Sequence, residues 1–400
     1  MGNSATSTAD GSSPVSETGL NELLARIARL RPTLREYGAQ GEQDRQVPEE
    51  SIATLTQAGA LRVSVPKRYG GLDLGHLAAM RVGREIGMAD GGTAWVISLL
   101  NSGAWYTRHF SERAQDEIFA ADPSTPVSAV VAPTGTARRV RGGYLVTGEW
   151  AYNSGSWHAR WALLAAKLQD ERGAAIGEAQ VLIPSSDYWI EDVWRVAGMR
   201  SSGSNLLIAE EAFVPDHRLI ETSGKSAAQS APGQERVYRA ASVPLALLGP
   251  QLGLGRAILE AVVNEAGTRG VAYTAIPRKS EWVPLQLEVA RAAQMLDTAD
   301  CFAERAGAYL DAVDPEAPVD YLPRARVRGD VGWAVENVTE AIRILLSVAG
   351  ASAFADSNPL QRFWRDQAVV ARHGYVSPTQ SLEVYGKAVL GVENTEAILL

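Results

Sequence analysis

Apolar residues recur at helical spacing through the first third of the chain. Leu20, Leu23, Ile27 and Leu30 fall three or four positions apart, which places them on one face of a helix. Together with later segments of the same period, this pattern predicts an N-terminal α-helical domain over residues 19–125. The further helical segments are 49–58, 76–88, 92–108 and 111–120.

The pattern changes between Val127 and Pro215, where short apolar or β-branched runs replace the helical period. Gly142-Gly143 and Pro184-Ser185-Ser186 supply turns between these runs. We therefore predict a β-barrel-like domain over residues 126–222. The runs that predict strands are 127–131, 144–147, 161–168, 180–183 and 206–214.

Long helical patterns return in the last third of the chain. They follow a segment rich in Ser, Gly, Ala and Gln, which we interpret as a linker over residues 223–236 before a helical bundle over 237–400. The order of elements predicts an α+β fold, in which an N-terminal helical domain, a central β domain and a C-terminal helical bundle pack around a shared cleft. Such clefts commonly hold cofactors. The bundle helices are expected at 243–266, 282–312, 323–350, 359–374 and 377–390.

Composition narrows the classes of partner. The net charge is -8 with no basic run, so the chain has no electrostatic footprint for nucleic acid or an anionic membrane surface. Residues 1–18 are small and polar and predict a disordered tail without a secretory signal, although Met1 to Thr6 match a loose myristoylation pattern. No apolar run suggests a membrane span. The single cysteine, Cys301, fits a reducing compartment, so we expect a cytoplasmic protein.

Several common chemical motifs are missing from the sequence. There is no phosphate-binding P-loop, and the nearest dinucleotide fingerprint, Gly253-Leu254-Gly255, has Ile258 in place of its third glycine. The five histidines are scattered without metal-ligand spacing, so no metal is expected. A G-x-S-x-G nucleophile elbow is also absent, which argues against a serine hydrolase.

Four segments resemble the acyl-CoA dehydrogenase superfamily. Pro66 to Gly71 matches its P-x-x-Y-G-G motif, and Trp150 to His158 looks like the turn that faces the flavin. Trp194 to Ser204, followed by Phe213-Val214-Pro215, is similar to its pattern of W, G-x-R, small-small-G-S and V-P. Pro359 to Asp366 matches its carboxyl-terminal signature. The segments lie in the order of the family and cover most of residues 20 to 395.

The resemblance implies a flavin site on the turn at residues 150–158. An isoalloxazine ring needs an apolar wall and a few polar groups at its edge. Ser154 is our candidate for contact with flavin N5, and the bland alternative is that the turn holds ordinary strand aromatics and turn residues. The family's bundle also contributes arginines to the cofactor phosphates, often from a neighbouring subunit. The other candidate cofactor-binding residues are Trp150, Asn153, Ser156, Arg278 and Arg362.

The catalytic base of an acyl-CoA dehydrogenase is missing. Its two known positions fall at His373-Gly374 and near Ser242, and neither holds a carboxylate. A histidine at this place resembles the two-component (class D) flavin monooxygenases, which implies that His373 is catalytic. The resemblance further implies that reduced FAD or FMN, with FADH2 preferred, comes from a separate reductase. The reduced flavin would react with O2 and form a C4a-hydroperoxyflavin. This species would hydroxylate a small indole- or phenol-like substrate.

The substrate pocket is expected near the end of the helix at residues 92–108. Relatives that hydroxylate phenols tend to carry a second histidine there, which this chain lacks. Its candidate substrate-binding residues are Asn101, Trp105, Tyr106, Ser128 and His158, with His109 as a further possible replacement. Three alternatives stay open: an amine-oxidising nitrososynthase, an acyl-CoA-type dehydrogenase and a silent flavin-binding subunit. The family also leads us to expect a homotetramer or homodimer.

Overall fold

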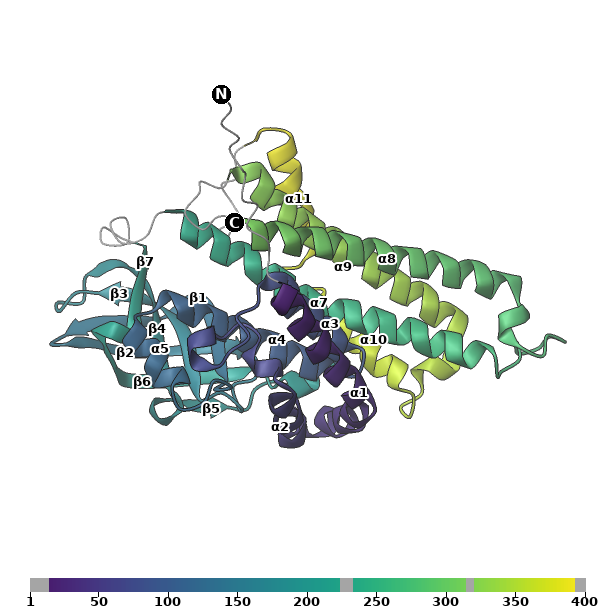
Figure 1. Cartoon of the computed structure of the whole chain (residues 1–400), viewed down its shortest axis with the longest axis horizontal. Coiled ribbons are helices and arrows are strands. Elements are labelled where there is room, and N and C mark those ends of the chain that lie inside the picture. Colours follow the sequence, from purple (N-terminus) through teal and green to yellow (C-terminus); the bar gives the residue numbers. More distant parts are fainter. Residues whose placement is uncertain (1–13, 224–232, 314–319, 393–400) are drawn as a thin grey trace, which may run out of the picture.

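The computed structural model describes residues 14–223, 233–313 and 320–392. Figure 1 shows a β-sheet at one end, a long helical bundle at the other and the N-terminal helices between them. This arrangement confirms the predicted α+β architecture of three parts.

The N-terminal domain consists of helices close to those that the periodicity predicts. Residues 14–18, assigned above to a disordered tail, are instead the start of the first helix, because an amphipathic helix can extend beyond its last apolar contact. Residues 1–13 of that tail lie outside the described part. The helices are α1 (Pro14–Asp44), α2 (Glu49–Ala58), α3 (His76–Gly87), α4 (Gly91–Tyr106) and α5 (Glu112–Phe119).

The central domain is one seven-stranded sheet in the order β5-β6-β2-β1-β3-β4-β7. β1 and β3 are parallel and the other neighbours are antiparallel. The sequence analysis missed β5 and β7, which are too short to show an alternating pattern. They form the two edges, so the sheet is not a closed barrel. The strands are β1 (Val127–Val140), β2 (Gly143–Asn153), β3 (Trp161–Gln169), β4 (Ala175–Pro184), β5 (Trp189–Glu191), β6 (Asn205–Pro215) and β7 (Leu219–Ser223).

The two faces of the sheet bury different clusters. Val127 and Ala129 pack into the cluster shared with the helices. Val130 and Ala162 belong to a second cluster that also contains Trp150. Because successive side chains of a strand point to opposite faces, this division shows which positions of β1 and β3 face the helical domains.

The C-terminal bundle contains the predicted long helices. The apolar stripe of α9, including Val331, Val335 and Val338, is fully buried, as its period predicts. α10 ends at Val370, so His373 lies in the turn that follows and not in the helix expected over 359–374. The expected linker is shorter than predicted, since α7 begins at Gly233, and residues 224–232 lie outside the described part. The helices are α7 (Gly233–Ala266), α8 (Val283–Ala312), α9 (Tyr321–Ala349), α10 (Pro359–Val370) and α11 (Pro378–Val389).

One helix of the described part is long and apolar enough to cross a membrane by these two criteria. It is the segment Val243–Ala266 of α7, and most of it is buried inside the protein. α7 packs against α3, α4, α8 and α9. The segment therefore has the surroundings of a core helix.

Candidate active site

Ser154 lies in a tight turn that follows β2 and points toward α4. Gly155 next to it adopts a left-handed backbone (φ +72°), and a side chain at this position would come within 2.9 Å of Val96 Cγ1. This close approach seats the turn on α4. There Trp95 Nε1 donates a hydrogen bond of 3.1 Å to Ser154 Oγ. The turn and the helix are thus joined by a buried polar contact.

A row of buried serine hydroxyls continues from Ser154. Its Oγ lies 2.7 Å from Ser204 Oγ, which lies 2.7 Å from Ser202 Oγ. Ser202 Oγ in turn donates a hydrogen bond of 2.8 Å to the carbonyl oxygen of Met199. The family-like segment before β6 therefore connects directly to the turn that holds Ser154.

His373 reaches the same place from the C-terminal bundle. Its ring packs edge-on against Trp95, with centroids 5.7 Å apart and planes at 65°. Tyr375 stacks on His373 with centroids 5.6 Å apart. Trp95 contacts both Ser154 and His373, so the structure brings together the two residues that the sequence analysis named as catalytic.

The surroundings of His373 favour a neutral imidazole. The His373 residue is exposed to solvent, but desolvation by the protein packed around its ring, followed by the charge of Arg328, lowers the pKa of His373. Arg328 is almost completely buried, at 5% exposure. It donates a hydrogen bond of 3.3 Å to the Gly374 carbonyl, and its guanidinium lies 5.8 Å from the Tyr375 ring centroid.

Further polar groups of the turn are buried and lack a partner among the described residues. They are both side-chain atoms of the Asn153 amide, Ser156 Oγ and His158 Nε2. Leaving such groups unpaired costs free energy, so the set fits a bound molecule with several donors and acceptors along its edge. The residues present therefore fit a flavin.

A cavity of about 370 Å³ opens beside this turn. Its lining includes Ser156, His158 and Glu49, and His158 Nδ1 lies 2.9 Å from Glu49 Oε1. Burial, opposed by the Glu49 charge, lowers the pKa of His158. A second cavity of about 510 Å³, between α1, α7 and the start of α10, contains none of Ser154, Trp95 or His373. We therefore locate the site by the polar groups and not by cavity size.

Tyr152, and not Trp150, offers an aromatic surface next to Ser154. Trp150 is 0% exposed, and its Nε1 donates a hydrogen bond of 2.8 Å to the Ala165 carbonyl inside the sheet. It cannot form the flavin wall suggested above, because alternation along β2 turns it toward the second cluster. Tyr152 is 73% exposed and has a left-handed backbone (φ +61°), a conformation that costs a bulky residue free energy.

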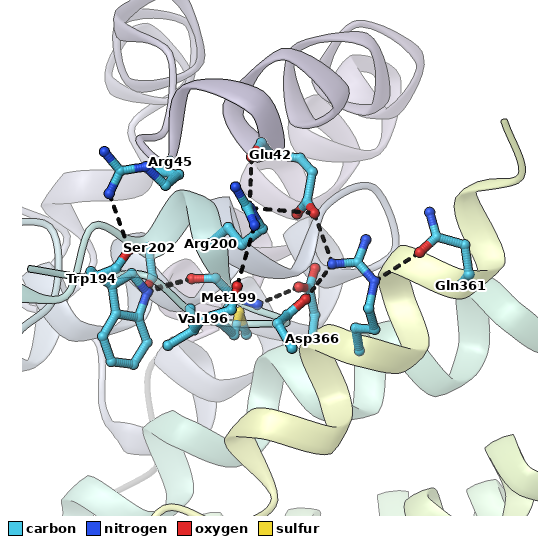
Figure 2. A network of polar contacts seen from close by, with 11 residues as sticks. Glu42, Arg45, Trp194, Val196, Met199, Arg200, Ser202, Gln361 and Asp366 are labelled. Carbon is cyan, nitrogen blue, oxygen red and sulfur yellow. Dashed lines mark hydrogen bonds and ion pairs between the residues drawn. The ribbon is translucent and has the colours of Figure 1, made fainter. Parts of the chain in front are cut away.

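Three parts of the fold meet around Met199 and Ser202 (Figure 2). Arg365 of α10 donates hydrogen bonds of 2.8 Å to Glu42 of α1 and 2.8 Å to Gln361. Met199 N donates a bond of 2.5 Å to Asp366 Oδ1. These contacts fix the segment that carries Ser202 and Ser204 between α1 and α10.

Arg362 belongs to this junction and not to an exposed phosphate site. It is buried and lies 3.6 Å from Asp90 Oδ1. Asp90 caps α4 by accepting a hydrogen bond of 2.8 Å from Thr93 N. Burial and the nearby Asp90 charge raise the pKa of Asp366 to about 8. The interaction with Asp90 gives Arg362 a structural role within the chain, and its assignment to the cofactor stays a prediction.

Asn101 and Ser128 do not line this site. Both amide hydrogens of Asn101 are used, in bonds of 2.8 Å to the Ala60 carbonyl and 3.0 Å to the Ile97 carbonyl. Ser128 is completely buried. It shares the sheet face of Val130, whereas its neighbours Val127 and Ala129 face the helices. Both were assigned to the substrate pocket because sequence position alone does not define the direction of a side chain.

Trp105 and Tyr106 lie in another cluster at the far end of α4. Trp105 is ten residues after Trp95, or about 15 Å along the helix axis. Its ring contacts those of Tyr106, His76 and His109, at centroid distances of 5.3, 4.8 and 5.0 Å. Burial, followed by the charges of Arg108 and His109, lowers the pKa of His76 to about 4. The structure does not bring this cluster together with Ser154 and His373.

Arg278 is exposed and forms an ion pair of 2.5 Å with Glu281. It belongs to the connection between α7 and α8, which lies at the end of the bundle away from the sheet (Figure 1). Within one chain it is therefore separated from the turn of Ser154. A cofactor contact through Arg278 would need the neighbouring subunit that the resemblance implies.

Trp95 and Arg328 were missed by the sequence analysis. Trp95 stands in an apolar helix, where an aromatic residue is usually a core residue. Arg328 stands in a helix with several other arginines. Neither position differs in local pattern from its neighbours, so no sequence signal short of a three-dimensional contact would have found them.

Comparisons with known proteins identify the family of this fold. Residues 27–121 match the family "Acyl-CoA dehydrogenase, N-terminal domain", and residues 245–378 match "Acyl-CoA dehydrogenase, C-terminal domain". The oxygenase subunit HsaA of a flavin-dependent monooxygenase from Rhodococcus jostii (strain RHA1) is 31% identical over 388 residues, which cover 94% of this chain and 100% of that protein. The chain belongs to the flavin-dependent monooxygenase family.

Two further proteins are similar over nearly the whole chain. The oxygenase component of an FADH2-dependent resorcinol hydroxylase from Rhizobium sp. (strain MTP-10005) is 30% identical, over 93% of this chain and 94% of that protein. The structure of XiaF from Streptomyces sp. in complex with FADH2 and glycerol has a TM-score of 0.90 and 31% identity. The match covers 96% of this chain and 99% of the XiaF chain. These similarities confirm the predicted fold and flavin enzyme class.

Proposed function

We propose that this monooxygenase hydroxylates a small aromatic, phenol- or indole-like substrate with reduced FAD or FMN and O2. One observation carries the proposal: Trp95 joins Ser154, on the flavin-like turn, to His373 from the bundle. The relatives include hydroxylases of aromatic compounds, such as the resorcinol hydroxylase. A separate reductase would supply the reduced flavin, and the enzyme would act in the cytoplasm as a homo-oligomer.

The residues of the site have different proposed roles. Ser154 would meet N5 of the flavin, with Tyr152 as an exposed aromatic surface and Asn153 and Ser156 as polar contacts. When bound, the reduced flavin supplies the electrons that activate O2. His373 would meet the substrate side of the site, because Trp95 separates it from the turn. The aromatic rings of Trp95 and Tyr375 beside His373 suit a planar substrate.

Acyl-CoA dehydrogenation is disfavoured by the same geometry. That reaction needs a carboxylate base near the flavin, but the family position after Arg365-Asp366 holds His373. Asp366 itself is completely enclosed in the junction with Met199 and is not available to a substrate. We therefore expect acyl-CoA thioesters to leave the enzyme-bound flavin oxidised.

The direct test supplies the protein with a flavin reductase, NADH, FAD and a panel of phenols and indoles under ¹⁸O2. A hydroxylated product that carries one ¹⁸O atom supports the function. His373→Ala should reduce product formation about a hundredfold, the usual scale for a positioned acid-base or hydrogen-bonding group. Anaerobic bleaching of bound flavin by an acyl-CoA thioester, without hydroxylation of any aromatic compound, would contradict the proposal.

A further inference from the structure

The buried hydroxyls between Trp95 and Met199 form a chain in which every proton has a defined direction. The chain runs from the Trp95 indole through Ser154, Ser204 and Ser202 to the Met199 carbonyl oxygen. All four side chains are buried. Because they are buried, the contacts within this row decide where each proton lies.

The Met199 end of the row decides which hydroxyl donates in each contact. A carbonyl oxygen has no proton, so Ser202 must donate across the 2.8 Å contact with Met199 O. A serine hydroxyl has one proton, and that of Ser202 is now used. The proton in the 2.7 Å contact with Ser204 therefore comes from Ser204. By the same reasoning, the proton between Ser204 and Ser154 comes from Ser154.

The Met199 oxygen is a well-fixed acceptor. It also accepts a hydrogen bond of 2.8 Å from Trp194 Nε1 and one of 3.1 Å from the Ser202 backbone N–H. The Met199 N–H is held by Asp366 on the other side of the same residue (Figure 2). Reversing the chain would leave Ser202 Oγ and this oxygen 2.8 Å apart without a proton between them, which is repulsive.

Ser154 Oγ is left with one lone pair that takes part in no hydrogen bond with a described residue. Its proton points to Ser204, and one lone pair accepts from Trp95 Nε1, because an indole nitrogen can only donate. One lone pair remains. Any further group that Ser154 binds must therefore donate a hydrogen to it.

We propose that the chain from Met199 to Trp95 makes Ser154 an obligate acceptor, and that this selects the reduced form of the flavin. N5 of an oxidised flavin is a bare acceptor, whereas N5 of a reduced flavin carries a hydrogen. Ser154 can bind the second and has no proton for the first. The inference rests on the proposed function, which places N5 at Ser154. It adds Ser204 and Ser202 as positioning residues, which do not touch the flavin but fix the direction of the Ser154 proton.

The test compares the affinities of the purified protein for oxidised and reduced FMN and FAD, without turnover. Oxidised flavin is titrated in air and dithionite-reduced flavin under anaerobic conditions, and the ratio of the two Kd values is the readout. We expect tighter binding of the reduced form. Ser204→Ala frees the Ser154 proton to donate to oxidised N5, so this ratio should fall by about tenfold, the effect of one hydrogen bond.

Ser202→Ala is the decisive second variant, because Ser202 has no contact with Ser154. Without Ser202, Ser204 can turn its proton toward Ser154, and Ser154 can then donate to N5. The Kd ratio should fall in the same direction as in Ser204→Ala. The matched control is Ser51→Ala, which removes another buried hydroxyl, one without a partner among the described residues, and should leave the ratio unchanged.

The outcomes separate the inference from the function on which it rests. Equal affinities for the two redox states in the wild type would overturn the inference alone. The same holds for a ratio that neither serine variant changes while their melting temperatures match the wild type. If Ser204→Ala does not fold, Ser202→Ala decides. Failure to bind either flavin in either redox state would overturn the proposed function as well.

Discussion

The backbone N–H of Tyr375 donates a hydrogen bond of 3.3 Å to Nδ1 of His373. An imidazolium has a proton on Nδ1 and cannot accept this bond, so the contact requires the neutral ring. The remaining proton then lies on Nε2. The nearby charge of Arg328 acts in the same direction, because it disfavours a second positive charge. His373 therefore presents a neutral N–H donor to the site.

Arg328→Met should raise the pKa of His373. Burial, followed by the Arg328 charge, lowers this pKa below the ordinary 6.5, so the wild-type ring stays neutral down to a pH below that value. Removing a nearby like charge should raise this pKa, and the imidazolium would then appear at a higher pH. The measurement is an NMR titration of ¹⁵N-labelled histidine, with His373→Asn to assign the signal.

Arg372→Gln is the control for this titration. Arg372 is the residue before His373, but its exposed side chain donates to the Ala368 carbonyl of the helix. Its removal should change the pKa of His373 less than removal of Arg328. A wild-type His373 that titrates at or above 6.5 would contradict the role assigned to Arg328.

Tyr152→Ala should weaken flavin binding about tenfold, the scale of one lost aromatic contact, because it removes the exposed ring beside Ser154. The melting temperature should not fall, since Tyr152 buries little surface and its left-handed backbone is strained. Fluorescence titration with reduced FMN under anaerobic conditions measures the affinity. Tyr152→Phe keeps the ring and should bind like the wild type; equal weakening in both variants would argue against a ring contact.

Trp150→Phe should have the opposite profile. It removes the hydrogen bond to the Ala165 carbonyl and leaves a space between Gly135 and Gly148, which both lie against the indole ring. We expect a loss of about 2 kcal/mol of unfolding free energy with flavin affinity retained. Chemical denaturation and the same flavin titration test the two parts separately. A large loss of affinity in a stable Trp150→Phe protein would restore Trp150 to the cofactor site.

Asp366→Asn should become more stabilising as the pH rises. The pKa of Asp366 is raised from 3.8 to about 8, so between these values the unfolded chain releases a proton that the folded protein keeps. Wild-type stability therefore falls as the pH increases through this window. Asparagine has no such proton and can still accept the bond from Met199 N. From pH 5 to 7, the melting temperature of Asp366→Asn should rise relative to the wild type by a few degrees, or about 1 kcal/mol or more.

An exposed carboxylate provides the comparison. Asp187 lies on the surface of the segment after β4, so Asp187→Asn should track the wild type over the same pH range. A parallel pH dependence of Asp366→Asn and the wild type would show that Asp366 is ionised in the folded protein.

The fold was largely predictable because its helices and central strands have long, regular apolar periods. The stripe of α9 is one example, and the buried runs of β3 are another. The edge strands β5 and β7 were missed because they are short and half exposed. The end of α10 was placed too late, since the residues after Val370 keep some apolar spacing although the chain turns at His373 and Gly374.

The site was predictable where the resemblance supplied short motifs, and not where side-chain direction decides. Trp95 contacts both Ser154 and His373, while their catalytic roles stay predictions. Trp150, Ser128 and Asn101 were misassigned because a one-residue shift along a strand, or a quarter turn of a helix, moves a side chain to another face. Trp95 and Arg328 depend on contacts between segments far apart in the sequence, and no local pattern encodes such contacts.

The position of Asp366 and His373 near the carboxyl end has a consequence for synthesis of the chain. Ribosomes make the protein from the N-terminus, and earlier domains can fold while later ones are still being made. A nascent chain can therefore assemble α4 and the turn of Ser154 before either residue exists. Asp366 can hold the Met199 segment, and His373 can reach Trp95, only after α10 and the turn that follows it have been made. A chain arrested before α10 would lack both.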